Sequence, residues 1–259
     1  MQRYFLDGET SEADTAVVVG ANYHHMIHVM RMQPGDPLEV VRDGRAYRAT
    51  LWRIVGDQAH LAIIEEIAVS TESTIPLILL QGLPKGDKID LIVRQTCEIG
   101  VSRIIVYEGE RSVAVLPPGK RADRKTRWNR IAREAAELAH RTLQPEVTIA
   151  DSLAAACGSL AAETWLLAPY ESQTSALPSL KQVLRGHGGH PGAAGGGTPP
   201  IAFVVGPEGG LADSEVEWLK ECGAALLTLG PRILRTETAG AVVAAAILYE
   251  FDQLGGYTD

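Results

Sequence analysis

The chain has 259 residues, 46% of them hydrophobic and 22% charged, with a net charge of −8 at pH 7. This length is sufficient for two domains. No run of about 18 apolar residues is present, so we expect no membrane span, and the polar N-terminus lacks the apolar core of a secretory signal. The three cysteines (Cys97, Cys157 and Cys222) are far apart and have no CxxC spacing, which favours unpaired thiols in a reducing cytoplasm.

Charge is distributed unevenly along the chain. Residues 1–68 carry six arginines and ten acids, residues 85–141 carry thirteen basic residues and eight acids, and residues 142–259 carry five and thirteen. The middle block is therefore the only one with a net positive charge. The acidic total argues weakly against a nucleic-acid partner, but a local basic patch on an acidic protein can still bind phosphates.

The first 70 residues predict a small, mostly antiparallel β-barrel. Asp43-Gly44 is a hairpin-turn signal between two alternating runs. The segment NYHHMIHVMRMQPGD predicts one short helix that ends at Pro34-Gly35. The strand-like runs are TAVVVG, LEVVRDGRAYRATLWRIV and AHLAIIEEI.

From Ile75 onward, strand-like and helix-like segments alternate. This alternation predicts a mostly parallel sheet covered by helices on both faces. The predicted strands are IPLILLQGL, VSRIIVYEG, EVTIA, ETWLLAPY, IAFVVG and AALLTLG. One helix is predicted to end at Gly100, and its inward residues at helical spacing are Ile89, Ile92, Val93, Thr96 and Ile99. A second, over residues 120–141, is predicted to bury Trp128, Ile131, Ala135 and Leu138.

A polar segment, VSTESTIP, predicts a domain boundary near residues 70–75, giving domains 1–72 and 73–259. The segment 185–200, RGHGGHPGAAGGGTPP, is of low complexity and predicts a flexible glycine-rich insertion. Its histidines, His187 and His190, could suggest a metal, but the composition favours a linker. We therefore predict no metal site.

Three unusual turns follow predicted strands: LLAPYES, VVGPEGGLADSE and LGPRILRTETA. Because ligands bind at the carboxyl ends of strands in open parallel sheets, the three turns are candidates for one shared site. The second turn lacks both the GxxxxGK[ST] and the GxGxxG phosphate-binding patterns. Its Gly206, Gly209 and Gly210 let the backbone approach a ligand or adopt a positive φ, although such turns also occur without function. Ser214 and Glu217 are expected to form a capping box.

The third turn precedes a helix, AGAVVAAAI, that is apolar on nearly every side. We expect Thr236 to cap this helix and Glu237 to suit its positive first turn. A helix of this kind is packed on two faces, either in a core or against another subunit. Two interpretations remain open: a polar loop held rigidly for binding, or a capped core helix with two surface arginines.

Four motifs occur in a fixed order and resemble the 16S rRNA uridine-N3 methyltransferase family: LQGLPKGDKIDLIVRQTCEIGV, ERSV, FVVGPEGGLADSEV and LGPRILRTETAGAVV. RYFLDG and HHMIHVMRMQPGD are similar to that family's small-domain signatures. The resemblance covers nearly the whole chain but not the glycine-rich insertion. It implies a SPOUT-type α/β fold: a parallel sheet with a C-terminal trefoil knot. It also implies a PUA-like N-terminal β-barrel that binds RNA, and a homodimer formed through the knotted domain.

The resemblance further implies S-adenosylmethionine as the methyl donor and N3 of a specific uridine in 16S rRNA of the small ribosomal subunit as the acceptor. Apolar side chains would sandwich the adenine while backbone groups read its edge. A side chain added at Gly209 is expected to fill this space without unfolding the protein. The donor-binding candidates are Leu167, Ala168, Pro169, Gly206, Pro207, Glu208, Gly209, Leu229, Gly230, Ile233, Leu234 and Thr238.

Methylation at N3 requires loss of an imide proton, so a base or a nearby positive charge should help. N3 lies on the Watson–Crick edge, so the uridine has to be unpaired or flipped out. Arg232 and Arg235 are candidate cations, and Glu237 or Glu208 is the candidate proton acceptor. The RNA-positioning candidates are Arg3, His25, Arg31, Lys85, Lys88, Arg111, Lys120, Arg121, Arg124 and Lys125. For the charged run at 120–133, a solvated helix face is an equal alternative.

Two other functions compete with the methyltransferase hypothesis. A non-catalytic RNA-binding module of α/β plus barrel architecture predicts salt-dependent RNA affinity that is indifferent to the donor. A nucleotide-binding α/β protein is disfavoured because the phosphate motifs are missing.

Overall fold

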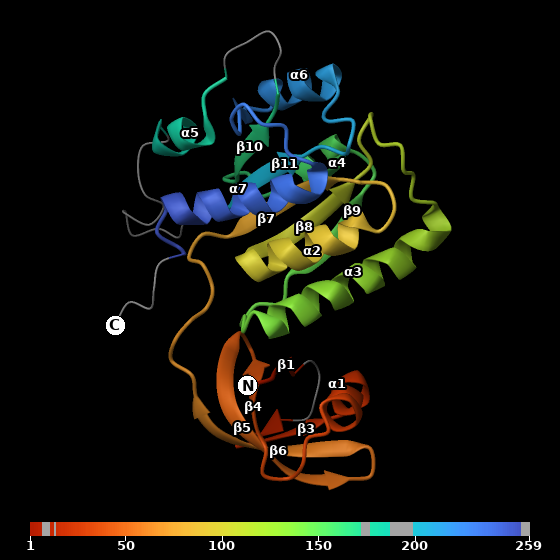
Figure 1. Ribbon diagram of the computed structural model, residues 1–259, viewed down its shortest axis with the longest axis vertical. Coiled ribbons are helices and arrows are strands. Elements are labelled where there is room, and N and C mark those ends of the chain that lie inside the picture. Colours follow the sequence, from red (N-terminus) through yellow and green to blue (C-terminus); the bar gives the residue numbers. More distant parts are fainter. Residues whose placement is uncertain (7–10, 13, 172–176, 187–198, 255–259) are drawn as a thin grey trace. The chain divides into compact units, whose positions relative to one another are not determined.

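Figure 1 shows the computed structural model, which describes residues 1–6, 11–12, 14–171, 177–186 and 199–254. The chain divides into two compact units, Met1–Glu72 with Ala136–Gln144, and Ser73–Ala135 with Pro145–Asp259. Most of the predicted glycine-rich insertion, including both of its histidines, lies outside the described residues.

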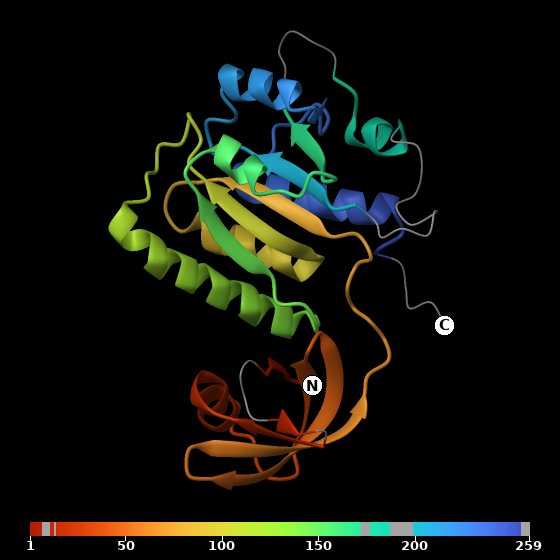
Figure 2. The same cartoon turned by 180° about the vertical axis from the view of Figure 1, so that it is seen from behind.

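The first unit contains a six-stranded, mixed and curled sheet with the strand order β1-β4-β5-β6-β3-β2 (Figure 2). The β1–β4 pair is parallel and the other four pairs are antiparallel, as the sequence mostly predicts. Asp43 and Gly44 have φ values of 51° and 74°, which suit the predicted tight hairpin between β4 and β5. The strands are β1 (Arg3–Phe5), β2 (Ser11–Glu12), β3 (Thr15–Val18), β4 (Pro37–Arg42), β5 (Arg45–Val55) and β6 (Gln58–Glu66).

The helix predicted in this unit is shorter than expected and is not regular. Helix α1 (Gly20–His24) continues into a π-helical turn, η1 (His25–Val29). Arg31 then adopts a left-handed φ of 55° and turns the chain away from the helix axis. The helix therefore ends at Val29, before the predicted stop at Pro34-Gly35.

The second unit contains a six-stranded sheet with the order β12-β10-β11-β7-β8-β9. Every pair in it is parallel, which confirms the prediction from alternating strands and helices. The strands are β7 (Leu77–Gly82), β8 (Val101–Tyr107), β9 (Glu146–Ala150), β10 (Trp165–Pro169), β11 (Ile201–Val205) and β12 (Ala225–Leu227). The helices are α2 (Lys88–Ile99), α3 (Pro118–Leu138), α4 (Leu153–Gly158), α5 (Leu180–Gly186), α6 (Asp213–Glu221) and α7 (Thr236–Glu250).

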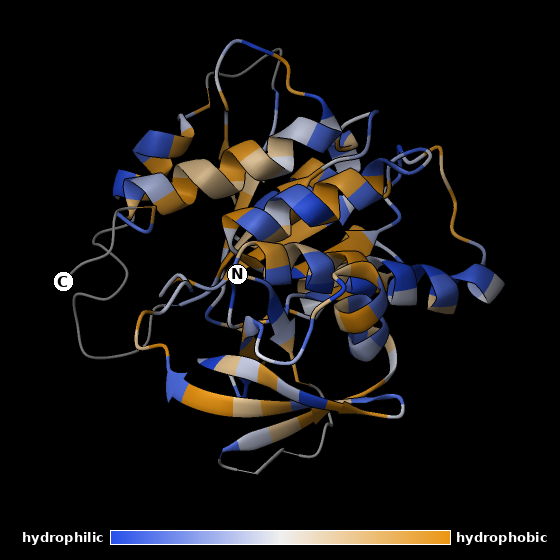
Figure 3. Ribbon diagram, turned by 60° about the horizontal axis from the view of Figure 1, so that its bottom comes forward, coloured by the Kyte–Doolittle hydropathy of each residue, from blue (hydrophilic) through white to orange (hydrophobic). Residues whose placement is uncertain are grey.

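Helices cover both faces of this sheet (Figures 1 and 2). Strand residues alternate between the faces. Leu77 and Leu79 belong to the apolar cluster that includes α2, α3, α5 and α7. Ile78 and Leu80 belong to the cluster that includes α4 and α6. All six residues of β7 are buried, so the central strands have no polar face, and apolar residues concentrate along them in Figure 3.

The inward face of α3 differs from the prediction at its end. Trp128, Ile131 and Ala135 are buried, but Leu138 is 74% exposed. Leu138 lies in the part of α3 that belongs to the first unit, whereas the other three residues belong to the second. In α2, Cys97 is buried, while the predicted Ile99 is only half-buried at the helix end. Gly100 follows α2 with a φ of 126°, which fits the predicted stop.

Candidate functional site

A pocket of about 1160 Å³ opens at the carboxyl ends of β10, β11 and β12. Strands β8 and β9 lie on one side of β7, and β11, β10 and β12 lie on the other. The pocket therefore lies near the switch point of the sheet, where the strand order reverses. Residues from all three predicted turns line it. The structure therefore brings together three segments that the sequence separates by about 60 residues.

Most of the donor-binding candidates line this pocket, and a few do not. Leu167 and Ala168 are fully buried inside β10, one on each face of the sheet, and are core residues. Gly230 and Thr238 lie in the same segments but do not line the pocket either. The candidates that line it are Pro169, Gly206, Pro207, Glu208, Gly209, Leu229, Ile233 and Leu234.

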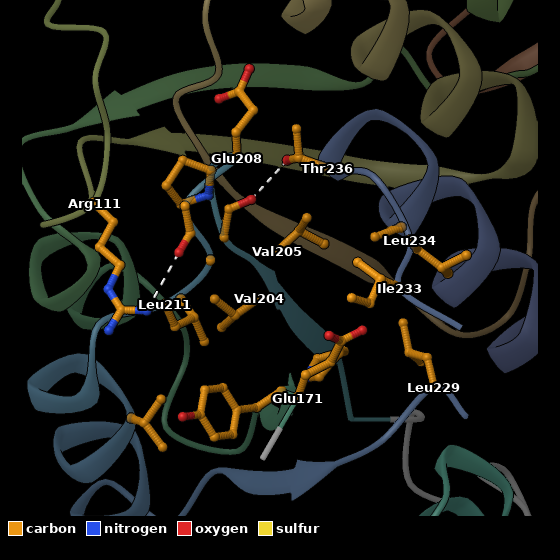
Figure 4. Close-up of a pocket in the computed structure, with 18 of the residues that line it drawn as sticks. Arg111, Glu171, Val204, Val205, Glu208, Leu211, Leu229, Ile233, Leu234 and Thr236 are labelled. Carbon is orange, nitrogen blue, oxygen red and sulfur yellow. Dashed lines mark hydrogen bonds between the residues drawn. The ribbon is translucent and has the colours of Figure 1, made fainter. Parts of the chain in front are cut away.

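Apolar side chains form opposite walls of the pocket (Figure 4). Val204 and Leu211 approach from β11 and the turn that follows it, and Ile233 and Leu234 approach from the segment before α7. Ile233 is 82% exposed, so its side chain is accessible to a ligand in the pocket. Such walls suit a flat apolar ring, and the turn backbones supply polar groups at its edge.

The glycines of the 206–210 turn are required by neighbouring protein atoms. A Cβ at Gly206 would lie 2.8 Å from the carbonyl carbon of Gly210, which itself has a φ of 71°. A Cβ at Gly209 would lie 2.9 Å from the Cβ of Arg111. A side chain at Gly209 would therefore meet the 109–112 segment, and its effect on the ligand space stays a prediction.

Thr236 does not cap α7, because Arg235 has the extended backbone of the N-cap and Thr236 is already helical. Its hydroxyl instead donates to the carbonyl oxygen of Gly206 at 2.7 Å and accepts from Nε2 of Gln81 at 2.9 Å. Gln81 is fully buried at the end of β7. One buried hydroxyl therefore links the end of β7, the 206–210 turn and the start of α7.

The expected Ser214–Glu217 capping box is also wrong. Helix α6 has Ala212 as its N-cap, so the capping carboxylate at the third helical position belongs to Glu215. Glu215 accepts from the backbone N–H of Ala212 at 2.8 Å and from that of Glu110 at 3.2 Å. Ser214 donates to the Glu110 carboxylate at 2.7 Å. These contacts attach the 109–112 segment to one side of the pocket.

A charged cluster lies at the other side of the pocket. The Nζ atom of Lys88 is 2.7 Å from Glu208 and 3.7 Å from Oε2 of Glu237, so the predicted RNA contact Lys88 lies in the pocket. Glu208 also accepts from the backbone N–H of Lys85. Partial burial alone would raise the pKa of Glu208, but the hydrogen bonds from Lys88 and from backbone N–H groups hold that pKa below its usual value. The Glu208 hydrogen bond in turn raises the pKa of Lys88.

The remaining catalytic candidates also line the pocket. Arg235 is exposed, and its Nη1 atom lies 3.9 Å from Glu237. Arg232 is exposed next to it. Oε2 of Glu237 is buried and has no hydrogen-bond partner. Of the two glutamates, Glu237 is therefore the less occupied acceptor.

The RNA-positioning candidates fall into two groups. Arg3 is only 4% exposed, pairs with Glu39 at 2.8 Å and donates to the carbonyl oxygen of His140, so its role in the fold is structural rather than RNA-contacting. Arg121 pairs with Glu108 and Asp151, and Arg124 pairs with Asp87. These pairs support the alternative of a solvated helix face for residues 120–133. The candidates with exposed side chains are Arg31, Lys85, Arg111, Lys120 and Lys125.

Two of these candidates are positioned by specific contacts. Arg111 donates to the carbonyl oxygen of Gly209 at 3.4 Å and lines the pocket (Figure 4). His25 contacts the hydroxyl of Tyr4 through its Nδ1 atom at 3.1 Å. None of the three cysteines forms a disulfide bond within the described residues. Within the described ranges, no helix is long and apolar enough to cross a membrane, and no three His, Cys, Asp or Glu side chains group to hold a metal ion.

Comparison with known proteins identifies the family. An RNA methyltransferase domain matches residues 71–248, and an RNA methyltransferase PUA domain matches residues 20–64. The ribosomal RNA small subunit methyltransferase E of Bacillus subtilis is 33% identical over 265 aligned residues that cover 99% of each chain. The chain belongs to the ribosomal RNA small subunit methyltransferase E family. The family member from Mycobacterium tuberculosis is 29% identical and covers 94% of this chain and 90% of its own.

Solved structures extend this family assignment to the fold. A Neisseria gonorrhoeae family member bound to S-adenosylmethionine is 28% identical, with a TM-score of 0.80, covering 96% of this chain and 97% of its own. A methyltransferase from Legionella pneumophila with the same bound cofactor is 25% identical, with a TM-score of 0.81, covering 95% and 96%. The predicted α/β architecture with an N-terminal PUA domain is confirmed.

Proposed function

We propose that the chain methylates N3 of a uridine in 16S rRNA of the small ribosomal subunit, with S-adenosylmethionine as the methyl donor. The observation that carries this proposal is the pocket at the ends of β10, β11 and β12, because residues from each of the four motifs that carry the resemblance line it. Relatives that match nearly the whole chain bind this donor.

The residues present fit the donor. When bound, S-adenosylmethionine supplies a methyl group already activated on a sulfonium. Leu229, Ile233 and Leu234 offer an apolar wall for the adenine, and the backbone of the 206–211 turn offers hydrogen-bond partners for the polar edges. The cavity slightly exceeds the roughly 300–1,000 Å³ that is usual for one small ligand, which leaves room for part of a flipped base.

The pocket charges suit removal of the N3 proton. Glu237 is the proposed acceptor, because Glu208 is already occupied by Lys88 and a backbone N–H. Arg235 and Arg232 would stabilise the negative charge that develops on the uracil ring as its proton leaves. The proton on Glu237 would then return to solvent. As the bond between N3 and the methyl group forms, the bond from the methyl group to the sulfonium would break and leave a neutral thioether.

The organisation of the chain forms part of the proposal. Residues 1–72 would bind RNA as a PUA-like barrel, and residues 73–259 would carry catalysis with a knotted C-terminal segment. Helix α7 leaves Val242 40% and Tyr249 75% exposed, on the stripe opposite its buried face. We propose that this stripe joins two copies in a homodimer. Action on ribosomal RNA would place the protein in the cytoplasm.

Methyl transfer to ribosomal particles tests the function. Purified protein is incubated with labelled S-adenosylmethionine and with small subunits from a strain that lacks the corresponding gene. Mass mapping of rRNA fragments is expected to find one new methyl group on a uridine, at N3. Label found on another base, or absent from RNA while the donor binds normally, would contradict the proposal.

A further inference from the structure

Strand β5 carries a bulge that turns a tryptophan toward solvent. In the β5–β6 ladder, Leu51 pairs with Leu61 and Arg53 pairs with His60, which leaves Trp52 without a partner. A bulge redirects the side chain of the extra residue. Trp52 is 57% exposed, whereas Leu51 and Leu61 are fully buried. The N-terminal unit thus presents the largest apolar side chain type on its surface.

The residues beside Trp52 lie on the outer face of the sheet. Arg53, His60 and Val17 occupy one row across β5, β6 and β3. The adjacent row of Leu51, Leu61 and Ala16 is buried in the core of the unit. Because neighbouring rows of a sheet face opposite sides, the row with Arg53 and His60 faces outward.

Arg53 differs from its neighbours in having no acidic partner. Its guanidinium lies 4.6 Å from the centroid of the Trp52 ring. In the same strand, Arg45 pairs with Glu66 at 3.3 Å and Arg48 pairs with Glu65 at 2.5 Å. Arg53 has no ion pair in the part of the chain that the structure describes. The segment that contains Arg53 has more acids than bases, yet none of these acids that the structure describes pairs with it. The charge of Arg53, beside an exposed ring, is therefore available to an anionic partner.

We propose that Trp52 and Arg53 form a stacking platform for an unpaired base of single-stranded RNA. The indole ring would stack on the base, and the guanidinium would contact a neighbouring phosphate while still lying against the ring. Stacking of a base on an aromatic ring contributes enough affinity to position a strand. The proposal rests on the proposed function, which makes rRNA the substrate.

Binding of a labelled single-stranded RNA of about 12 nucleotides to the full chain tests the platform. Trp52→Ala is expected to weaken binding by about tenfold, and Trp52→Phe is expected to retain most of the affinity. Ile64→Ala is the matched control, because Ile64 is 63% exposed on the same sheet but has no aromatic ring; its affinity should stay within about twofold. Arg53→Ala should reduce the salt dependence of binding by about one released counterion. Arg45→Ala, which removes the same charge from an ion pair, should change it less.

Wild-type RNA affinity in Trp52→Ala, or an equal loss in Ile64→Ala, overturns the platform. If Trp52→Ala changes only the molar mass in light scattering, the surface joins copies of the chain and the proposal is also overturned. Methyl transfer separates this inference from the proposed function. A platform variant should raise KM for RNA while kcat and donor affinity stay unchanged. Loss of RNA affinity in Trp52→Ala, without methyl transfer by the wild type, would leave the platform standing and remove the function.

Discussion

The hydroxyl of Thr236 donates a hydrogen bond of 2.7 Å to the carbonyl oxygen of Gly206, although the two residues lie 30 positions apart. The same hydroxyl accepts from Gln81. Two of the three turns that form the pocket are thereby fixed to β7, all of whose residues are buried. This bond explains why a dense polar loop lies directly against a buried helix: its threonine sets the position of the glycine-rich turn.

Removing this hydroxyl should loosen the pocket. We expect Thr236→Val to lose about 1–2 kcal/mol of stability, because a buried carbonyl and a buried amide each lose a partner. Affinity for S-adenosylmethionine should fall by about tenfold, as measured by isothermal titration calorimetry. Thr236→Ser retains the hydroxyl and is the control. Equal donor affinity in the valine and serine variants would remove Thr236 from the account.

Gly82 is a second position where the turn is held by close packing. A Cβ there would lie 2.5 Å from Cδ and 2.6 Å from the backbone nitrogen of Pro207, so Gly82→Ala must push the 206–210 turn outward. We expect a destabilisation of about 1–3 kcal/mol together with weaker donor binding. Gly119→Ala is the matched control, since no atom lies within 4 Å of its added Cβ. Thermal unfolding and donor titration of both variants measure the difference, and unchanged donor affinity in Gly82→Ala would contradict it.

Arg235 should matter for turnover rather than for the donor. It is 85% exposed at the pocket, so its removal leaves the fold intact. We expect Arg235→Ala to lower kcat by about 100-fold, in the range seen when one group that stabilises transition-state charge is removed. The Kd for the donor should change by no more than about twofold. Arg130→Ala, an exposed arginine on α3, is the control. Wild-type turnover in Arg235→Ala would place the stabilising charge elsewhere.

Tyr4 gives the N-terminal unit a pH-dependent stability. Burial, and to a lesser degree the charge of Glu137, raises the pKa of Tyr4 to about 12. The unfolded chain releases this proton near pH 10, so the stabilisation is complete below pH 10 and is lost as the pH rises toward 12. The loss amounts to up to about 3 kcal/mol. Urea unfolding between pH 9 and 12 should show a smaller decline in Tyr4→Phe than in wild type; parallel declines would exclude Tyr4 as the cause.

Local sequence patterns predicted most of the fold and the place of the pocket. Short apolar runs such as Leu77–Gly82, bounded by turn residues, favour a strand buried on both faces. Three turns at strand ends must meet at one edge of a parallel sheet, so their convergence follows from topology.

Two of the misplaced details depend on partners that are distant in the sequence. The sequence predicts Arg3 as a surface cation, whereas in the structure it is bound by Glu39 and His140. The sequence predicts that Gly209 leaves space for a ligand, whereas in the structure Arg111 packs against it. The sequence predicts Ser214 and Glu217 as the capping pair of α6. The helix instead starts at Asp213, so Glu215 is the capping carboxylate. Local propensity does not determine such contacts, which tertiary packing decides.

We propose that the turns after β10, β11 and β12 form one site for the methyl donor. A crystal structure of the chain grown with S-adenosylmethionine tests this claim most directly. We expect the adenine ring of the donor to lie between the 204–211 segment and Leu229, Ile233 and Leu234. The methyl group on the donor's sulfonium should point toward Arg235 and Glu237. Donor density elsewhere on the protein, with this pocket unchanged, would contradict it.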